Sequence, residues 1–438
     1  MSDIFVLGGA QTDFLRNWTR EGSTIADLIA EPVHSALANS DIGAADVQVA
    51  HVGNFASEIY CGQGHLGGLL VESDPAFSGL PTSRHEAACA SGSVAVLAAM
   101  ADLEAGRYGV ALVVGVELMR NVGTATAVAN LGAAAWVPDE TDGIPMVWPE
   151  VFATLGDEYD RRYGLDDGHL RAIAQSSFAN ARRNPLAQTR RWELPSGAFT
   201  DNDHDNPRVA GRLRRHDCSQ ITDGAAAVVL ASSDFASEWA RARSRDLGEI
   251  PRIAGWGHRT ARMSYAGKLA DSAGERFVFP HVRGTITDAF ERAGLVDVHA
   301  LDAIECHDCF TTTHYMAIDH FGITEPGESW KAIENGDVFA DGPLPINPSG
   351  GLIGCGRPVG ASGVRMLFDV TKQVAGEAGD CQVEGARTAA TLNIGGSATT
   401  SVSFVVTTTE GFRTRSRRPA YPPAGGTGLA RRSDEAVW

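Results

Sequence analysis

The stretch SGSVAVLAAMADLEAGRYGVALVVGVELM, residues 91–119, decides the fold class of this chain. Its first part, residues 91–109, is rich in small residues and is predicted to form a helix that closes at Gly106. Its second part, VALVVGVELM (110–119), is a continuous apolar run, which is typical of a strand buried on both faces. A helix that leads into such a strand indicates an α/β body with a mostly parallel sheet.

The same alternation extends outward through most of the chain. The predicted strands are 4–10, 47–55, 110–119, 223–232, 250–258, 302–308, 386–394 and 400–408, and the predicted helices are 24–40, 91–109, 282–295, 310–321 and 361–376. Ala-Ser-Gly opens the helix at 90–92 and again at 361–363, and both of these helices end in Ala-Gly. This internal echo predicts two similar halves, each built as one sheet with its helices.

The alternation weakens between residues 120 and 215, where Trp, Arg, Asp and Asn become more frequent. We therefore predict an N-terminal half (1–249) with an inserted loop domain (about 120–215), a C-terminal half (250–411) and a tail (412–438) rich in Arg, Pro and Gly. The tail holds too little apolar area for a core, so we expect a surface arm or disorder there.

The composition excludes several classes of protein. A formal net charge of −17 argues against a general nucleic-acid binder, because such proteins need a basic face. Seven cysteines, an odd number, fit a reduced intracellular setting better than a disulfide framework. The N-terminus MSDIFVLGGAQTDF does not resemble a signal peptide, and no apolar run reaches the length of a membrane span. We expect a cytoplasmic protein without nucleic-acid or membrane partners.

Cys89, in HEAACASGSVA (85–95), is the first candidate catalytic residue. It immediately precedes a predicted helix, whose N-terminus offers free N–H groups and a partial positive charge. Both features favour a thiolate, the nucleophilic form of cysteine. The alternative is a small buried cysteine that only fills space.

The stretch ECHDCF (305–310) supplies two more candidates, His307 and Cys309, at the end of a predicted strand. A neutral imidazole can donate a hydrogen bond to a thioester oxygen, and a thiol can exchange a proton. Cys306 and Cys309 also form a C-x-x-C, but no second ligand pair completes a zinc site, so we expect no metal. On a strand these two side chains would point to opposite faces, which argues against a redox dithiol.

Five motifs in one order carry a family resemblance. They are Cys89 in its small-residue setting, DGAAA (223–227), HDCF (307–310), NPSGG (347–351) and NIGG (393–396). Over roughly residues 1–410 the chain resembles the thiolases, and most of all the sterol-carrier-protein type, which also has HDCF. The resemblance implies a thiolase fold, with two similar halves in five αβαβα layers and an inserted loop domain.

The resemblance also implies an activity, that of an acyl-CoA C-acyltransferase of the acetyl-CoA acetyltransferase type, in lipid metabolism. Cys89 would carry the acyl group, and His307 would belong to an oxyanion hole for the thioester oxygen. Cys309 would shuttle the α-carbon proton, and the N–H groups of Cys89 and Gly395 would hold the acyl-enzyme oxyanion. No cofactor would be bound permanently, because coenzyme A thioesters are the substrates. The inserted region, with its arginine clusters, would bind coenzyme A.

The resemblance extends to partners. It implies a homodimer or a dimer of dimers, and some relatives work with a small zinc-ribbon/OB-fold protein.

The loop NPSGGLIGCGRPVGASG (347–363) departs from the family pattern. Arg357 stands where the resemblance implies a histidine that activates the nucleophile, and an arginine cannot act as a base near neutral pH. Three readings follow. Arg357 could lower the pKa of Cys89 by Coulomb attraction, leaving a standing thiolate. The chemistry could instead be retro-aldol or retro-Claisen cleavage of a CoA thioester, with His307 and Cys309 handling protons. Or the site is degenerate, and the protein binds acyl-CoA or supports a partner without turnover. In the simplest alternative, Arg357 turns away to pair with a carboxylate.

Two other histidines are weaker candidates. His65, in CGQGHLGG (61–68), could approach a site or serve only as a turn residue. His85 precedes Cys89 by four residues, and we interpret it as structural.

Overall fold

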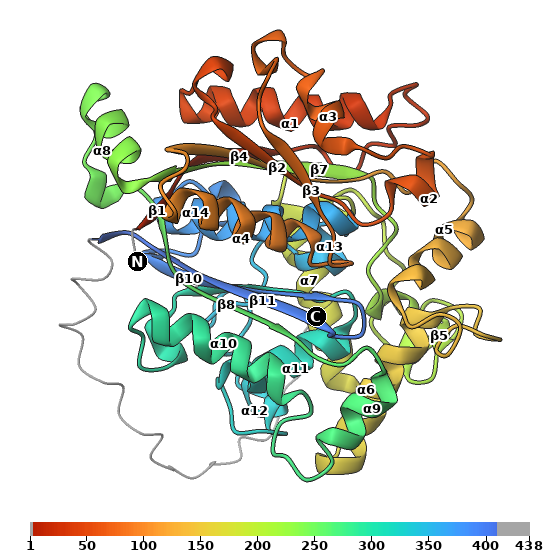
Figure 1. The fold of residues 1–438 in the computed structure, drawn as a ribbon. Coiled ribbons are helices and arrows are strands. Elements are labelled where there is room, and N and C mark those ends of the chain that lie inside the picture. Colours follow the sequence, from red (N-terminus) through yellow and green to blue (C-terminus); the bar gives the residue numbers. More distant parts are fainter. Residues whose placement is uncertain (1–2, 410–438) are drawn as a thin grey trace.

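The computed structural model describes residues 3–409, which form five layers of alternating helices and sheets (Figure 1). One outer layer contains α1 (Ile25–Ser40) and α3 (Leu66–Val71), and the other contains α10 (Pro280–Ala293) and α11 (Thr311–Phe321). The central layer between the two sheets contains α4 (Ser91–Glu104) and α14 (Ser362–Ala375). The predicted five-layered α/β thiolase fold is therefore confirmed.

The strands follow the predicted positions closely. They are β1 (Ile4–Gln11), β2 (Val49–Gly53), β3 (Thr82–His85), β4 (Val110–Glu117), β7 (Gly224–Ser232), β8 (Arg252–Thr260), β9 (Ala303–Cys306), β10 (Thr388–Gly395) and β11 (Thr400–Thr407). Their order is β3-β2-β4-β7-β1 in the first half and β8-β11-β10-β9 in the second. The halves join edge to edge only where β1 meets β8, at Ile4–Ile253 and Phe5–Arg252.

The expectation of a mostly parallel sheet is wrong. β2 is parallel to β3 and β4, and β9 is parallel to β10, whereas β1, β7, β8 and β11 form antiparallel pairs. β4 is buried along its whole length, as its apolar run predicted. Burial on both faces results from the layered fold, and it does not fix the direction of the neighbouring strands.

The two central helices explain the echo in the sequence, because both begin at Ser-Gly. A side-chain carbon at Gly92 would lie 2.6 Å from the carbonyl oxygen of Gly360, and one at Gly363 would lie 2.4 Å from the backbone nitrogen of Ser93. Only glycine allows the N-terminal ends of α4 and α14 to approach this closely. The segments that carry the candidate residues therefore meet at the centre of the molecule.

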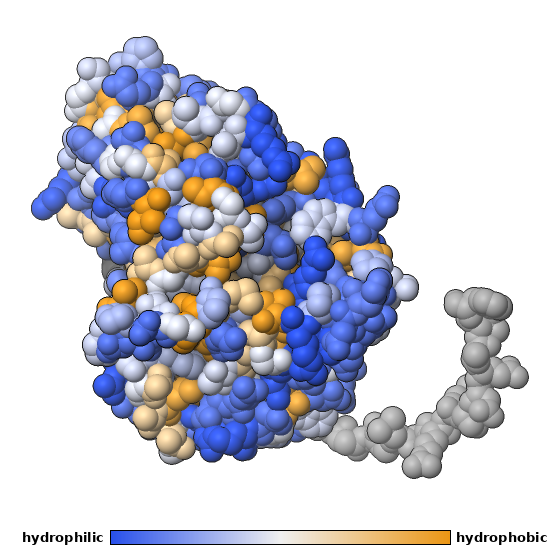
Figure 2. All heavy atoms as spheres, turned by 90° about the vertical axis from the view of Figure 1, so that its right-hand side faces the viewer, coloured by the Kyte–Doolittle hydropathy of each residue, from blue (hydrophilic) through white to orange (hydrophobic). Residues whose placement is uncertain are grey.

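The inserted region forms mainly helices: α5 (Thr124–Leu131), α6 (Val147–Tyr163) and α7 (Asp167–Arg183), followed by the hairpin of β5 (Arg208–Ala210) and β6 (Leu213–Arg214). α6 and α7 pack against α11 of the C-terminal half. Figure 2 shows the face of the molecule that carries α2 (Ser57–Cys61) and α5, where apolar side chains lie among charged ones. Exposed apolar residues in α2 and in the segment that follows α5 are Ile59, Trp136, Val137 and Ile144.

The remaining helices were not predicted individually. They are α8 (Ser233–Ala242), α9 (Tyr265–Asp271), α12 (Ser329–Glu334) and α13 (Gly351–Gly354). Among residues 3–409, no helix combines the length and the apolar character that crossing a membrane requires. The predicted tail, 412–438, lies outside the described residues.

Candidate active site

Cys89 lies in a tight loop between the end of β3 and the start of α4. Ser91 shapes this loop, because its Oγ accepts from the N–H of Ala87 at 2.9 Å and donates to the carbonyl oxygen of Ala88 at 2.6 Å. Ala88 adopts the left-handed backbone conformation, with φ of 51°. The half-buried Cys89 side chain is therefore held just before the helix, as the sequence predicted.

The turn after β10 packs directly on the Cys89 loop. A side-chain carbon at Gly395 would lie 2.2 Å from the carbonyl oxygen of Ala87, so this contact requires glycine. The backbone N–H of the next residue, Gly396, lies near enough to the Cys89 sulfur to lower the pKa of its thiol. The structure thus brings Gly395 to Cys89, and it adds the N–H of Gly396, which the sequence analysis did not name.

Arg357 turns towards Cys89. Its backbone N–H donates to Thr222 Oγ1 at 2.9 Å, its side chain is buried, and its guanidinium lies near enough to the Cys89 sulfur to lower the pKa of that thiol. Arg357 forms no ion pair with any carboxylate of residues 3–409, and its buried Nε atom has no hydrogen-bond partner there. The reading in which Arg357 turns away to pair with a carboxylate is therefore wrong.

The expectation of a standing thiolate is not met. Burial raises the pKa of the Cys89 thiol above its usual range, and this effect exceeds the lowering by the Arg357 guanidinium and by the N–H of Gly396. The buried carboxylate of Glu117 raises the same pKa further. Cys89 is thus held as a thiol, and Arg357 offsets only part of the cost of ionising it.

His307 and Cys309 lie at the end of β9, close to the same guanidinium. Burial, together with the positive charges of Arg357 and Arg365, holds the pKa of His307 well below its usual range, so this imidazole is neutral. Burial raises the pKa of Cys309 far above its usual range, so it is a thiol. Cys306 contacts Asn347 Nδ2 at 3.6 Å, whereas Cys309 faces Thr313 Oγ1 at 3.9 Å, so the two cysteines turn apart as expected.

Asn393, Ser93 and Cys218 also belong to this cluster. Asn393 begins the NIGG motif, where the resemblance implies a catalytic cysteine in many thiolases; its Nδ2 lies 3.0 Å from His307 Nδ1, and Ser93 Oγ donates to its Oδ1 at 2.8 Å. Cys218 lies beside Cys309, since it forms a backbone bridge with Phe310. The sequence analysis did not name Ser93 or Cys218, because no motif specifies their contacts.

Glu117, at the end of β4, clamps the glycine loop to the first half. It accepts hydrogen bonds from the backbone N–H groups of Phe55, Ala56 and Gly360 and from the side chain of Asn54, at 2.9 to 3.2 Å. Burial raises its pKa to about 7, and the N–H donors oppose this rise. The loop that presents Arg357 is therefore fixed by one buried carboxyl group.

Other candidates lie outside this cluster. His65 is an exposed residue with φ of 54° at the start of α3, which fits a turn residue. His85 Nε2 contacts His51 Nδ1 at 3.0 Å and Ser83 Oγ at 2.9 Å.

Five of the nine arginines in the clusters of the inserted region form ion pairs within the chain, so the clusters are partly neutralised. Arg161, Arg162, Arg190, Arg212 and Arg214 each bind an aspartate or glutamate. The expected basic patch for coenzyme A is therefore much weaker than the sequence suggests.

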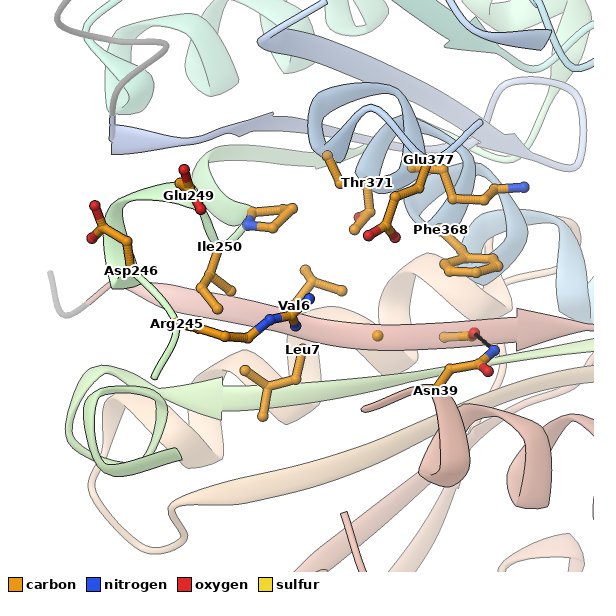
Figure 3. Close-up of a pocket in the computed structure, with 15 residues that line it drawn as sticks. Val6, Leu7, Asn39, Arg245, Asp246, Glu249, Ile250, Phe368, Thr371 and Glu377 are labelled. Atoms are coloured by element: carbon orange, nitrogen blue, oxygen red, sulfur yellow. Dashed lines mark hydrogen bonds between the residues drawn. The ribbon is translucent and has the colours of Figure 1, made fainter. Parts of the chain in front are cut away.

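A cavity of about 500 Å³ lies elsewhere, between β1, the segment before β8 and α14 (Figure 3). Its lining includes Asn39, Arg245, Glu249, Phe368 and Glu377, and none of the predicted site residues. The cavity is therefore separate from the chemistry that surrounds Cys89.

Comparison with known proteins agrees with this fold. The family model described as thiolase, N-terminal domain, matches residues 4–234, and the model described as thiolase C-terminal domain-like matches residues 268–408. An acetyl-CoA acetyltransferase of Methanothermobacter thermautotrophicus is 31% identical over 92% of this chain and 99% of its own length. Human sterol carrier protein 2 is 26% identical over 90% of this chain and 70% of its own.

A solved structure named Ltp2-ChsH2(DUF35) aldolase shares the fold, with a TM-score of 0.72 and 19% identity over 93% of this chain and 98% of that one. Together the two domain matches cover most of the described chain. Cys89 lies within the first match, and His307, Cys309 and Arg357 lie within the second. This chain therefore belongs to the thiolase family.

Proposed function

We propose that the protein transfers acyl groups from coenzyme A thioesters through an acyl-cysteine on Cys89. One observation carries the proposal. The Cys89 sulfur lies before the N-terminus of α4, and the nearby Arg357 guanidinium and Gly396 N–H both lower the pKa of its thiol. A sulfur surrounded by donors of this kind is stabilised when it becomes a thiolate.

In the first step, Cys89 Sγ attacks the keto carbon of a β-ketoacyl-CoA. The C–C bond to the α-carbon breaks, the acyl group remains on Cys89, and the enolate of the shorter CoA thioester leaves. The backbone N–H groups near Gly395 would hold the oxyanion formed at the keto carbon. Losing one such donor typically costs about 3–4 kcal/mol of barrier.

His307 and Cys309 would complete this cleavage. A neutral His307 donates a hydrogen bond to the enolate oxygen, and the Cys309 thiol gives its proton to the α-carbon. The raised pKa of Cys309 keeps it protonated at rest, so it holds the proton that this step requires. Free CoA then attacks the acyl-cysteine and regenerates Cys89, while its thiol proton restores Cys309.

The proton of Cys89 is the unusual part of this scheme, since Arg357 cannot accept it. Arg357 stabilises the thiolate after the proton has left to solvent, so the rate should rise with pH until Cys89 is ionised.

The raised pKa of Cys89 also favours a second candidate function. In a CoA-thioester C–C lyase of the retro-aldol type, Cys89 forms no acyl intermediate. His307 would then polarise the thioester oxygen, and Cys309 would protonate the α-carbon.

Intact-mass analysis after mixing the protein with acetyl-CoA and a panel of acyl-CoA thioesters tests the proposal, with Cys89→Ala as the control. Acyl transfer predicts an acyl adduct that the variant lacks. A lyase predicts cleavage products from both proteins without an adduct, and a protein that only binds acyl-CoA predicts neither.

The location, oligomeric state and partners of the protein are also proposals. We infer a cytoplasmic homodimer or dimer of dimers that needs no permanently bound cofactor. The name of the structural neighbour pairs an Ltp2 chain with a DUF35 protein, which supports a small partner for this chain too. Light scattering of the purified protein, alone and with a candidate partner, measures both assemblies.

A further inference from the structure

Three buried side chains form a hydrogen-bonded chain from α4 to the end of β9. Ser93 Oγ donates to Asn393 Oδ1 at 2.8 Å, and Asn393 Nδ2 lies 3.0 Å from His307 Nδ1. All three residues are buried, and they come from positions 300 and 86 residues apart in the sequence. The chain thus connects the helix that follows Cys89 with the imidazole of the HDCF motif.

The direction of these hydrogen bonds determines which nitrogen of His307 carries the proton. An amide nitrogen only donates, so His307 Nδ1 must accept from Asn393 and cannot carry a hydrogen. The ring is neutral, because burial and the nearby arginines disfavour its charged form. Its single proton is then on Nε2, the nitrogen that bonds to no group of residues 3–409.

We propose that Asn393 is a positioning residue, which holds His307 as the neutral tautomer with its proton on Nε2, and that Ser93 fixes the orientation of the Asn393 amide. The inference rests on the proposed function, in which His307 Nε2–H donates to the thioester oxygen. Ser93 lies one helical turn after Cys89, so the same helix supports the nucleophile and orients the donor. The asparagine at position 393 therefore has a task of its own.

An aspartate at position 393 has nearly the same shape as asparagine, but its ionised carboxylate would accept a hydrogen bond from His307 Nδ1 instead of donating one. In Asn393→Asp, the carboxyl group and the imidazole share one additional proton and titrate as a pair. Below the apparent pKa of the pair, Nε2 keeps its hydrogen. Above this pKa, the ionised carboxylate accepts a hydrogen bond from Nδ1–H. The single ring proton is then on Nδ1, and Nε2 carries none. The variant should therefore gain an alkaline loss of activity that the natural protein lacks.

Steady-state kinetics between pH 6 and 10 measure this effect. We expect kcat of Asn393→Asp to fall by about 10²–10³-fold on the alkaline side, the usual effect of losing one oxyanion donor, with a smaller change in KM. Asn180→Asp is the matched control, since Asn180 is also buried but bonds to the carbonyl oxygen of Asn347. It should show no new alkaline limb.

A second measurement needs neither activity nor a substitution at position 393. Nitrogen-15 NMR of the histidine-labelled protein, with His307→Gln to assign the signal, reports the His307 tautomer directly. A protonated Nε2 in the natural protein and a protonated Nδ1 in Asn393→Asp at high pH support the inference.

Two results would overturn it. One is a natural protein with its proton on Nδ1, which means that the amide has the opposite orientation. The other is an Asn393→Asp variant whose pH profile matches that of the natural protein. If the protein instead forms no acyl adduct while the NMR result stands, the proposed function fails and the tautomer assignment survives.

Discussion

Replacing Arg357 by methionine removes the only cation among residues 3–409 that lowers the pKa of the Cys89 thiol. Two unit charges about 4 Å apart attract each other by about 4 kcal/mol at an effective dielectric constant of about 20. Since one pKa unit corresponds to about 1.4 kcal/mol, losing this attraction should raise the pKa of Cys89 by about 3 units. The burial that already raises this pKa would then act with little opposition.

Alkylation by iodoacetamide measures the change, because only the thiolate reacts. At a fixed pH below the pKa of Cys89, we expect Arg357→Met to label its Cys89 peptide about 10²–10³-fold more slowly than the natural protein. Peptide-resolved mass spectrometry separates Cys89 from the half-buried Cys61 and Cys218. In the natural protein, labelling should itself rise steeply towards alkaline pH.

Arg262→Met is the matched control, because Arg262 is exposed and pairs with Asp271 far along the chain from the site. It should label like the natural protein. If Arg357→Met labels Cys89 within threefold of the natural rate across the pH range, Arg357 does not stabilise the thiolate. Arg357→His adds a base at this position, and a gain in thiolysis would show that removal of the Cys89 proton limits the natural rate.

Three further predictions concern the supports of the site. Glu117→Gln keeps the shape of the side chain but leaves one or more of the backbone N–H groups of Phe55, Ala56 and Gly360 facing the NH₂ of an amide. The free energy of unfolding, measured in urea, should therefore fall by about 2–4 kcal/mol. An unchanged value would contradict the role of Glu117 in fixing the loop. Burial lowers the pKa of Lys268 to about 8 from 10.5, so the unfolded state binds more protons between these values and stability should rise with pH there. Lys268→Met should flatten this rise, and a slope equal to that of the natural protein would count against it. In Gly395→Ala the new carbon meets the carbonyl oxygen of Ala87, so kcat should fall at least 100-fold in thiolysis assays; Gly274→Ala, where the space is open, should retain activity.

Several features of the fold followed from local sequence alone. Apolar runs such as 110–119 and the amphipathic stretch at 24–40 gave strands and helices within a few residues of their observed bounds. Thr24 caps α1 through a reciprocal pair of hydrogen bonds with Asp27, a local signal that involves only residues three positions apart. The identity of Cys89, His307, Cys309 and Arg357 as candidates also came from short motifs in a fixed order.

The direction of the strands could not be predicted in the same way. A buried apolar strand has the same composition whether its neighbour is parallel or antiparallel, so β4 gave no sign of its antiparallel partner β7. The expectation of a basic patch in the inserted region failed for a related reason. Arginines counted along the sequence suggest a basic patch, but Arg212 binds Asp157 and Asp160, and Arg190 binds Asp13 from the opposite end of the first half.

By itself, the sequence predicted an α/β body from local periodicity, and its ordered motifs, through their resemblance to the thiolases, indicated the architecture and named the sulfur, the imidazole and the cation. Only the tertiary structure decided that burial outweighs Arg357 at Cys89, and that Ser93 and Asn393 reach His307 across the two halves. The pKa of a group depends on every charge and on all the solvent removed around it. Those surroundings come from segments far apart in the chain, so no local pattern encodes them.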